Sequence, residues 1–212
     1  MMLLKFDSPQ VHDLLEIESG SLATGSIAQP PWVRKMLIDC PWVVVRRGEA
    51  PAGYIAVGVR GASRSERWGA YCAERHVKRI ARPADLLTLC RAAAHIHRAP
   101  ALMALREVVK KWRCVPFLWG PTGSVGFELA TGRPVTTEAS DLDLAICAPR
   151  PIGVEQARRL WNRVSKLRTK VDVRVETPQC GFSLEEYACA SPAPILLRYP
   201  DAPKLGDHPW GL

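Results

Sequence analysis

The sequence predicts an α/β fold of the α+β kind, in which a small β-rich N-terminal lobe precedes a mixed sheet flanked by helices. Runs of β-branched residues between glycine and proline, which are typical of strands, occur in the first third of the chain. Helical and strand-like periodicities then alternate through the rest of the chain. The chain has 212 residues, 47% of them hydrophobic and 24% charged, which suits a globular protein with an adequate core.

The N-terminal lobe is expected to cover residues 1–82. The segments Pro41–Arg46 and Tyr54–Val59 are apolar, rich in β-branched residues and bounded by turn formers, so each predicts a strand. A short helix is expected either near Ser21–Ala28 or over Pro31–Ile38, and the sequence leaves both open.

The second part of the chain, residues 83–212, is expected to form a separate domain. From Arg60 to Arg82 the composition shifts to seven lysines or arginines against two glutamates, and Pro83 then suits the first turn of a helix. A short helix after Ser183 and a strand at Ile195–Tyr199 are expected near the C-terminus. Before them, helices are expected at Pro83–Ala93, Pro100–Trp112, Val125–Ala130 and Gly153–Thr169. Strands are expected at Val115–Trp119, Asp141–Ala148 and Val171–Glu176.

Composition also narrows the class of protein. The formal charge of +8 and the pI of about 9.3 favour attraction of phosphates, acidic proteins or nucleic acids. The seven cysteines are scattered, without CxxC or Cys/His ligand spacing, which indicates reduced thiols and a cytoplasmic location. No secretion signal is readable, and no apolar run approaches the roughly 18 residues of a membrane helix, so no membrane association is expected.

Three aspartates carry the chemistry that the sequence suggests. In Asp141-Leu142-Asp143, strand alternation sends both aspartates to one face, with their backbones roughly 6.5–7 Å apart, which suits a shared divalent cation. Asp172 projects in the same way from a second strand, Val171–Glu176. It is expected either to complete the metal coordination or to accept the proton of an attacking hydroxyl. The predicted catalytic and metal-binding residues are therefore Asp141, Asp143 and Asp172.

Gly123-Ser124 is the predicted phosphate-binding element. The pair lies between an apolar strand and the start of a helix, where backbone N–H groups and a hydroxyl favour an anion. Glycine allows the backbone to approach phosphate closely. Gly-Ser after a strand and Asp-x-Asp are each common by chance. Together with the later single aspartate, however, they would supply a phosphate-binding segment, a carboxylate pair and a third carboxylate.

This order of Gly-Ser, Asp-x-Asp and a later single Asp resembles the nucleotidyltransferase superfamily that includes DNA polymerase beta. The resemblance covers Val115 to Glu176 and implies that residues 83–212 form a nucleotidyltransferase-like catalytic domain. Sixteen residues separate Ser124 from Asp141, more than in many members, so a longer connection is expected there.

A closer resemblance extends over nearly the whole chain. The strings that carry it are similar to the malonate decarboxylase holo-acyl carrier protein synthase family, the phosphoribosyl-dephospho-CoA transferases. The longest string runs from Trp119 to Thr136 and is followed by Ala139–Leu144. The others are His12–Leu15, Ile55–Gly61, Val171–Thr177 and Asp207–Trp210.

The closer resemblance implies a specific reaction. A serine of the apo acyl carrier protein subunit of malonate decarboxylase would attack triphosphoribosyl-dephospho-CoA in the presence of Mg²⁺, and diphosphate would leave. Asp141 and Asp143 match the metal-binding pair of the family, and Gly123 and Ser124 would hold the departing phosphates. Asp172 is added from the wider superfamily.

The basic residues near the lobe boundary allow two interpretations of their role. Arg60, Arg64 and Arg67 follow a predicted strand and are expected either to grip the phosphates of the donor or to form a solvated surface loop. A second basic set is expected to face an acidic carrier protein; its members are Arg75, Lys78, Arg79 and Arg82.

Two other functions remain open from the sequence. A nucleotidyltransferase that uses an ordinary nucleoside triphosphate on an RNA, protein or small-molecule hydroxyl would share the same metal site. A basic nucleic-acid-binding module without catalysis would explain the charge. The basic residues lack interleaved aromatics, however, and three carboxylates would repel a phosphate backbone, so no nucleic-acid partner is expected.

Overall fold

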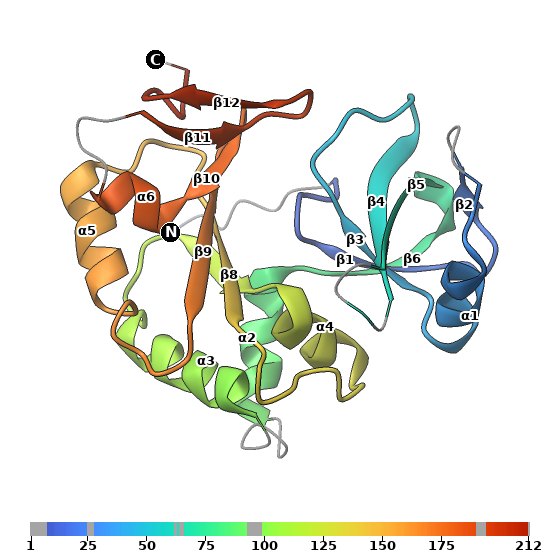
Figure 1. Cartoon of the computed structure of the whole chain (residues 1–212), viewed down its shortest axis with the longest axis horizontal. Helices are drawn as coiled ribbons and strands as arrows, with labels where there is room; N and C mark the ends of the chain where they lie inside the picture. The colour runs from blue at the N-terminus through green and yellow to red at the C-terminus, as the bar shows by residue number, and fades with distance from the viewer. Residues whose placement is uncertain are drawn as a thin grey trace. The chain divides into compact units, whose positions relative to one another are not determined.

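The protein consists of two compact units, Met1–Arg82 and Pro83–Leu212. Each unit contains its own six-stranded sheet together with helices (Figure 1), which confirms the α+β class. Among the described residues, no helix is both long and apolar enough to cross a membrane. The structure is a computed structural model, and it describes residues 8–24, 28–61, 63, 66–92, 99–189 and 194–211.

The N-terminal unit is built on an antiparallel sheet. Its strands are β1 (Leu14–Ile17), β2 (Leu22–Ala23), β3 (Trp42–Val45), β4 (Tyr54–Arg60), β5 (Arg67–Ala73) and β6 (Val77–Ala81). Their order in the sheet is β2-β5-β4-β3-β1-β6. The helical elements are α1 (Pro31–Asp39) and the short 3₁₀ helix η1 (Glu74–His76).

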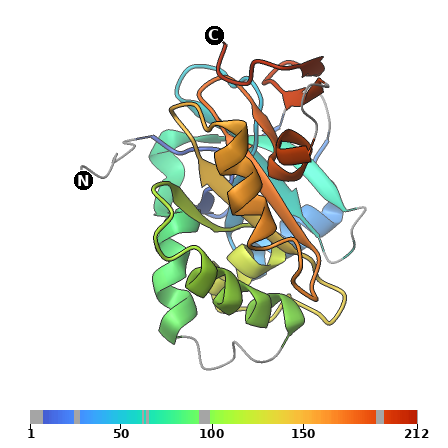
Figure 2. The same cartoon turned by 90° about the vertical axis from the view of Figure 1, so that its left-hand side faces the viewer.

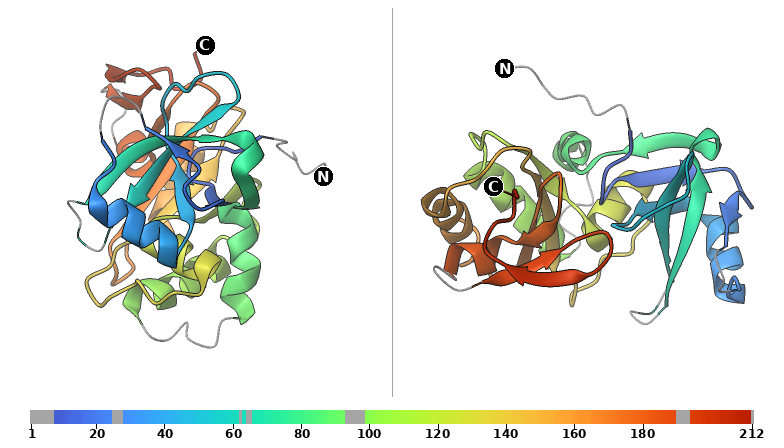
Figure 3. Two further views of the ribbon diagram at one scale, coloured as in Figure 1. Left: turned by 90° about the vertical axis from the view of Figure 1, so that its right-hand side faces the viewer. Right: turned by 90° about the horizontal axis from the view of Figure 1, so that it is seen from above.

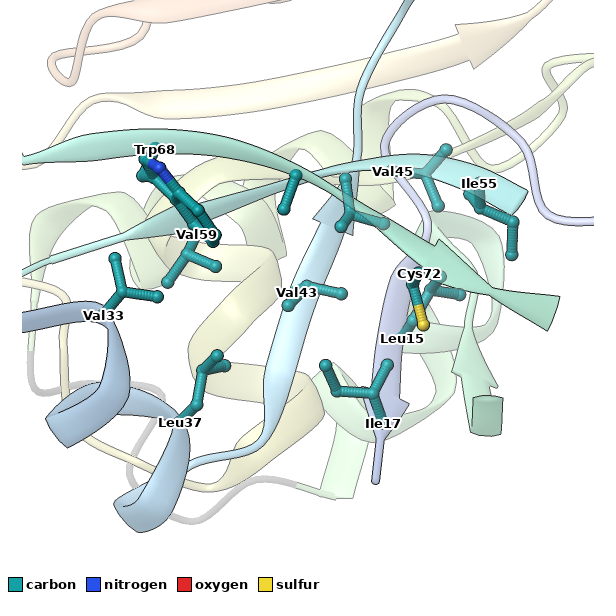
Figure 4. Close-up of a cluster of buried hydrophobic side chains, with 12 residues drawn as sticks. Leu15, Ile17, Val33, Leu37, Val43, Val45, Ile55, Val59, Trp68 and Cys72 are labelled. Atoms are coloured by element: carbon teal, nitrogen blue, oxygen red, sulfur yellow. The ribbon is translucent and has the colours of Figure 1, made fainter. Parts of the chain in front are cut away.

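One helix covers a face of this sheet (Figure 3). Val33 and Leu37 lie one turn apart on α1 and are almost fully buried against the strands. Their neighbours include Val43, Val59 and Trp68 (Figure 4). The helix expected over Pro31–Ile38 is therefore confirmed.

The alternative helix near Ser21–Ala28 is wrong for the residues of this range that the structure describes; residues 25–27 lie outside them. Leu22 and Ala23 instead pair with Cys72 and Tyr71 at the edge of the sheet. Hydrogen bonds to a distant strand replace those of a local helix, a pairing that local periodicity does not reveal.

The C-terminal unit is built on a mixed sheet, in the order β12-β11-β10-β9-β8-β7. The central strands β8 (Leu142–Cys147) and β9 (Val171–Glu176) are parallel, and the other neighbouring strands are antiparallel. The remaining strands are β7 (Leu118–Pro121), β10 (Gly181–Ser183), β11 (Ile195–Arg198) and β12 (Pro203–Gly206). The helices are α2 (Pro83–Ala92), α3 (Pro100–Lys111), α4 (Gly123–Thr131), α5 (Val154–Asn162) and α6 (Leu184–Cys189).

The two faces of this sheet differ in character. Leu142, Leu144 and Val173 point to one face and are almost completely buried; α5 and α6 lie on that side, and α2 and α4 lie on the other (Figures 1 and 2). The second face carries the half-buried aspartates of β8 and β9. Near β7 this face is closed, because a Cβ on Gly120 would overlap the carbonyl of Pro83 in α2.

The expected helix Gly153–Thr169 is too long. The α-helix ends at Asn162, and the N–H groups of Arg163, Val164 and Leu167 each bond a carbonyl three residues back. The chain therefore continues as turns, while Val164 stays fully buried. The apolar stripe thus extends beyond the helix, which explains why periodicity overestimates its length.

Candidate active site

The Asp-x-Asp segment lies at the start of the central strand β8. Asp143 is the second residue of β8, and Asp141 immediately precedes the strand. Because Leu142 and Leu144 are fully buried on the face covered by α5 and α6, alternation turns both aspartates to the opposite face. The side chain of Asp141 is 40% exposed, and its Oδ2 lies 3.9 Å from Nζ of Lys170.

Asp172 lies beside Asp143 on the neighbouring strand. In the parallel pair β8–β9, Asp143 is directly opposite Asp172, and adjacent strands run about 4.8 Å apart. Oδ2 of Asp172 accepts a hydrogen bond of 2.8 Å from Nη2 of Arg174. Alternation along β8 and register with β9 thus gather the three predicted aspartates on one face of the sheet.

The Gly-Ser segment is in contact with this acidic group. A Cβ on Gly123 would overlap the carboxylate of Asp143, and the backbone of Gly123 has a left-handed φ of +57°. The N–H of Thr122 donates a 2.9 Å hydrogen bond to the main-chain carbonyl of Asp143. Only glycine combines this conformation with so close an approach without strain.

The helix α4 begins with Gly123 and Ser124. The first N–H groups of a helix have no partner within the helix, and at the start of α4 these groups lie next to Asp143. The first turn of α4 contains no acidic residue, and Thr122 makes no side-chain capping bond. Ser124 is half-buried. Such a helix start favours an anion, and phosphate oxygens suit it.

The carboxylates offer only hard oxygen ligands. Mg²⁺ is usually held by one or two carboxylates together with phosphate oxygens and water. In the part of the chain that the structure describes, no three His, Cys, Asp or Glu side chains form a cluster that could hold a metal ion. The carboxylates of Asp141 and Asp143 are of the type that fits a magnesium ion shared with a phosphorylated substrate.

The predicted arginines belong to the other unit. Arg60 and Arg67 are exposed and lie opposite each other on β4 and β5, whereas the aspartates and the Gly-Ser segment lie in the unit Pro83–Leu212. Arg64 lies outside the described residues. In the second basic set, Arg79 bonds Glu16 at 3.1 Å and lies over the ring of Trp42, so it is tied to its own sheet.

Two residues near the site were given no role from the sequence. Strand alternation over Val171–Glu176 predicts Arg174 on the same face as Asp172, and the structure shows that Arg174 pairs with this carboxylate. Glu128 is fully buried within α4, three residues after the buried Val125 and directly before the buried Leu129. A glutamate among apolar residues of a helix is the signal that could have drawn attention to it.

Both parts of the chain match models of the same protein family. Residues 87–209 match the family model described as phosphoribosyl-dephospho-CoA transferase MdcG C-terminal domain, and residues 10–83 match the model of the corresponding N-terminal domain. No solved structure matches the chain.

Curated relatives with the name phosphoribosyl-dephospho-CoA transferase match over almost their full length. A protein of Pseudomonas putida is 36% identical over 97% of this chain and 97% of its own. A protein of Pseudomonas aeruginosa is 35% identical over 95% and 94% of the two chains. One of Klebsiella pneumoniae is 34% identical over 96% and 97%.

Proposed function

The chain belongs to the phosphoribosyl-dephospho-CoA transferase family, and on that basis we propose that it loads an apo acyl carrier protein. The donor is triphosphoribosyl-dephospho-CoA, and the acceptor is a serine of the acyl carrier subunit of malonate decarboxylase. The contact between Gly123 and Asp143 supports this proposal most directly, because it joins a phosphate-binding helix start to a pair of carboxylates.

The reaction is a phosphoryl-type substitution. The serine oxygen of the acceptor attacks the α-phosphorus of the donor, and a new P–O bond forms. The bond from that phosphorus to the oxygen bridging to the β-phosphorus breaks, so diphosphate leaves with the bridging oxygen. The proton of the serine passes to a base in the site.

The face of the sheet that carries Asp141, Asp143 and Asp172 (the acidic face) and the adjoining start of α4 have separate roles in this reaction. Asp141 and Asp143 would hold Mg²⁺, which supplies positive charge against the phosphate oxygens when it is bound. The backbone N–H groups and the hydroxyl at Gly123 and Ser124 receive the phosphates that depart. Asp172 accepts the proton, since it is the carboxylate opposite Asp143 and Arg174 holds its orientation.

The experiment that tests this function follows the acceptor by intact mass. The purified protein is incubated with triphosphoribosyl-dephospho-CoA and the apo acyl carrier subunit, with Mg²⁺ or with a chelator. A mass gain of one phosphoribosyl-dephospho-CoA unit, in the Mg²⁺ sample alone, is the expected result.

Two further samples sharpen this test. The variant Asp201→Asn serves as a surface control, because Asp201 is exposed and its carboxylate pairs with nearby Lys204. It should react like the wild type. Replacing the donor by ATP should give no transfer. Nucleotide transfer from ATP, with none from triphosphoribosyl-dephospho-CoA, would instead support an ordinary nucleotidyltransferase and overturn the proposed donor.

A further inference from the structure

The connection between α4 and β8 determines how the two halves of the candidate site meet. It runs from Gly132 to Ser140 without helix or strand (Figure 1), and it links the helix that begins with Gly123 to the strand that carries Asp143. Because the connection has no helix or strand hydrogen bonds of its own, contacts with other residues must hold it in one conformation.

A single buried carboxylate holds the middle of this connection. Glu128 has no exposed surface, and its Oε2 accepts hydrogen bonds from the N–H of Val135 at 2.9 Å and the N–H of Thr136 at 2.8 Å. The hydroxyl of Thr136 donates a third bond of 2.7 Å to the same oxygen. Thr136 is 1% exposed, so its N–H and its hydroxyl are withdrawn from water.

The end of the connection leads directly into Asp141. The N–H of Thr137 donates to Oγ of Ser140 at 2.9 Å, and the N–H of Ser140 donates to the carbonyl of Thr137 at 3.1 Å. This turn begins at the residue after Thr136 and ends at the residue before Asp141. The position of Asp141 therefore depends on where Glu128 holds Thr136.

Asp141 has more need of such support than Asp143. The paired part of β8 begins at Leu142, which lies opposite Val171, whereas Asp143 lies within the strand and its carbonyl is bonded by Thr122. Asp141 precedes the ladder, so the preceding turn contributes directly to its placement.

We propose that Glu128 is a positioning residue for transfer, which fixes Asp141 relative to Asp143 through Val135 and Thr136. This inference rests on the proposed function, because it assigns Asp141 and Asp143 to a shared Mg²⁺. Glu128 itself does not touch the metal or the donor. Its effect is to lower the Mg²⁺ concentration that transfer requires.

The test compares Glu128→Ala with Glu128→Gln in the full chain. Glutamine keeps an oxygen acceptor in the same place, whereas alanine leaves the three donors without it. The Mg²⁺ concentration for half-maximal transfer should rise about tenfold or more in Glu128→Ala, as is usual when support of a metal ligand is lost. It should stay near the wild-type value in Glu128→Gln.

Hydrogen exchange supplies a readout that does not depend on catalysis. Amides of residues 135–140 should exchange faster in Glu128→Ala than in the wild type, while those of Leu144 and Ile146 within β8 stay protected. Glu155→Ala, a change at an exposed helical glutamate paired with Arg158, should alter neither the exchange nor the Mg²⁺ requirement.

The outcomes separate the two proposals. Wild-type protein that transfers without Mg²⁺ contradicts the proposed function, whatever the variants do. A folded Glu128→Ala with wild-type exchange and Mg²⁺ requirement overturns the positioning role, and so does a Glu128→Gln as defective as Glu128→Ala. If Glu128→Ala does not fold, Thr136→Val removes one of the three bonds; a smaller rise in Mg²⁺ requirement is expected, and none would contradict the role.

Discussion

Asp143 is the residue at which the candidate site comes together. Its neighbour Asp141 follows from strand alternation and could be predicted from the sequence alone. Its contact with Gly123 and its register with Asp172 depend on how helix and strands pack. The sequence therefore indicated which residues meet, but not that Gly123 lies against the carboxylate itself.

Gly123 gives the first prediction at this scale. In Gly123→Ala, the new Cβ would overlap the carboxylate of Asp143, so transfer should fall by about tenfold or more through displacement of a reacting group. Gly132→Ala is the matched control, because its φ of +72° is also left-handed and nothing lies within 4 Å of a Cβ there. Both variants should lose roughly 1–2 kcal/mol of stability in urea unfolding.

Only Gly123→Ala should lose activity. Equal activity of the two variants at a temperature where both are folded would show that the approach of Gly123 to Asp143 has no part in transfer.

Asp172 gives a second prediction, which separates its two candidate roles. In Asp172→Asn, loss of a proton acceptor should lower kcat by a factor of about 10²–10⁴. The Mg²⁺ concentration for half-maximal activity should stay near that of the wild type. A large rise in this concentration, measured by titration of Mg²⁺, would make Asp172 a metal ligand instead.

At the level of elements, some of the predicted helices and strands have nearly the expected bounds, whereas the seven-residue strand β5 was not predicted. The strand β9 has the expected bounds, and α3 differs from its expected range by one residue. The short strands β10 and β12 were not predicted, since neither is long enough to show alternation, and β12 is largely exposed. These strands depend on pairing with β9 and β11, which only the folded chain provides.

The C-terminal segment is held in place by contacts that local sequence does not reveal. Nε1 of Trp210 donates to the carbonyl of Ala148 at 2.9 Å, and the carbonyl of Pro209 accepts a 3.0 Å bond from the hydroxyl of Thr177. The ring of Trp210 packs edge-on against Phe182 at 5.5 Å between centroids. These contacts give the terminal Asp207–Trp210 string a structural role.

Trp210→Ala should therefore destabilise the protein by about 2–3 kcal/mol in urea unfolding, at the lower end for a tryptophan because the residue is half-buried. Trp210→Phe keeps a ring but loses the N–H, and should cost only about 1 kcal/mol. Stability of Trp210→Ala within about 0.5 kcal/mol of the wild type would mean that the terminal segment adds nothing to the unit, as for an ordinary surface substitution.

At the scale of the whole molecule, charge is the property that bears on the acceptor. The formal charge of +8 should steer an acidic carrier protein toward this chain. Steering of this kind weakens as salt shortens the range of the electrostatic field.

The KM for the apo acyl carrier subunit should accordingly rise several-fold between about 0.05 and 0.5 M NaCl, with little change in kcat. Sucrose at matched osmolality is the control and should leave KM unchanged. A KM that does not respond to salt would show that long-range attraction contributes nothing to recognition of the acceptor.

The central claim is that the acidic face of β8 carries out the transfer. Its most direct test is single-turnover modification of the apo acyl carrier subunit, followed by intact mass, with wild type, Asp143→Asn and the surface control Asp201→Asn. Modification should be complete with the wild type and the control, and reduced by a factor of about 10³ or more with Asp143→Asn, whose fold should survive because the amide keeps the shape of the side chain. Wild-type modification by Asp143→Asn would contradict the account.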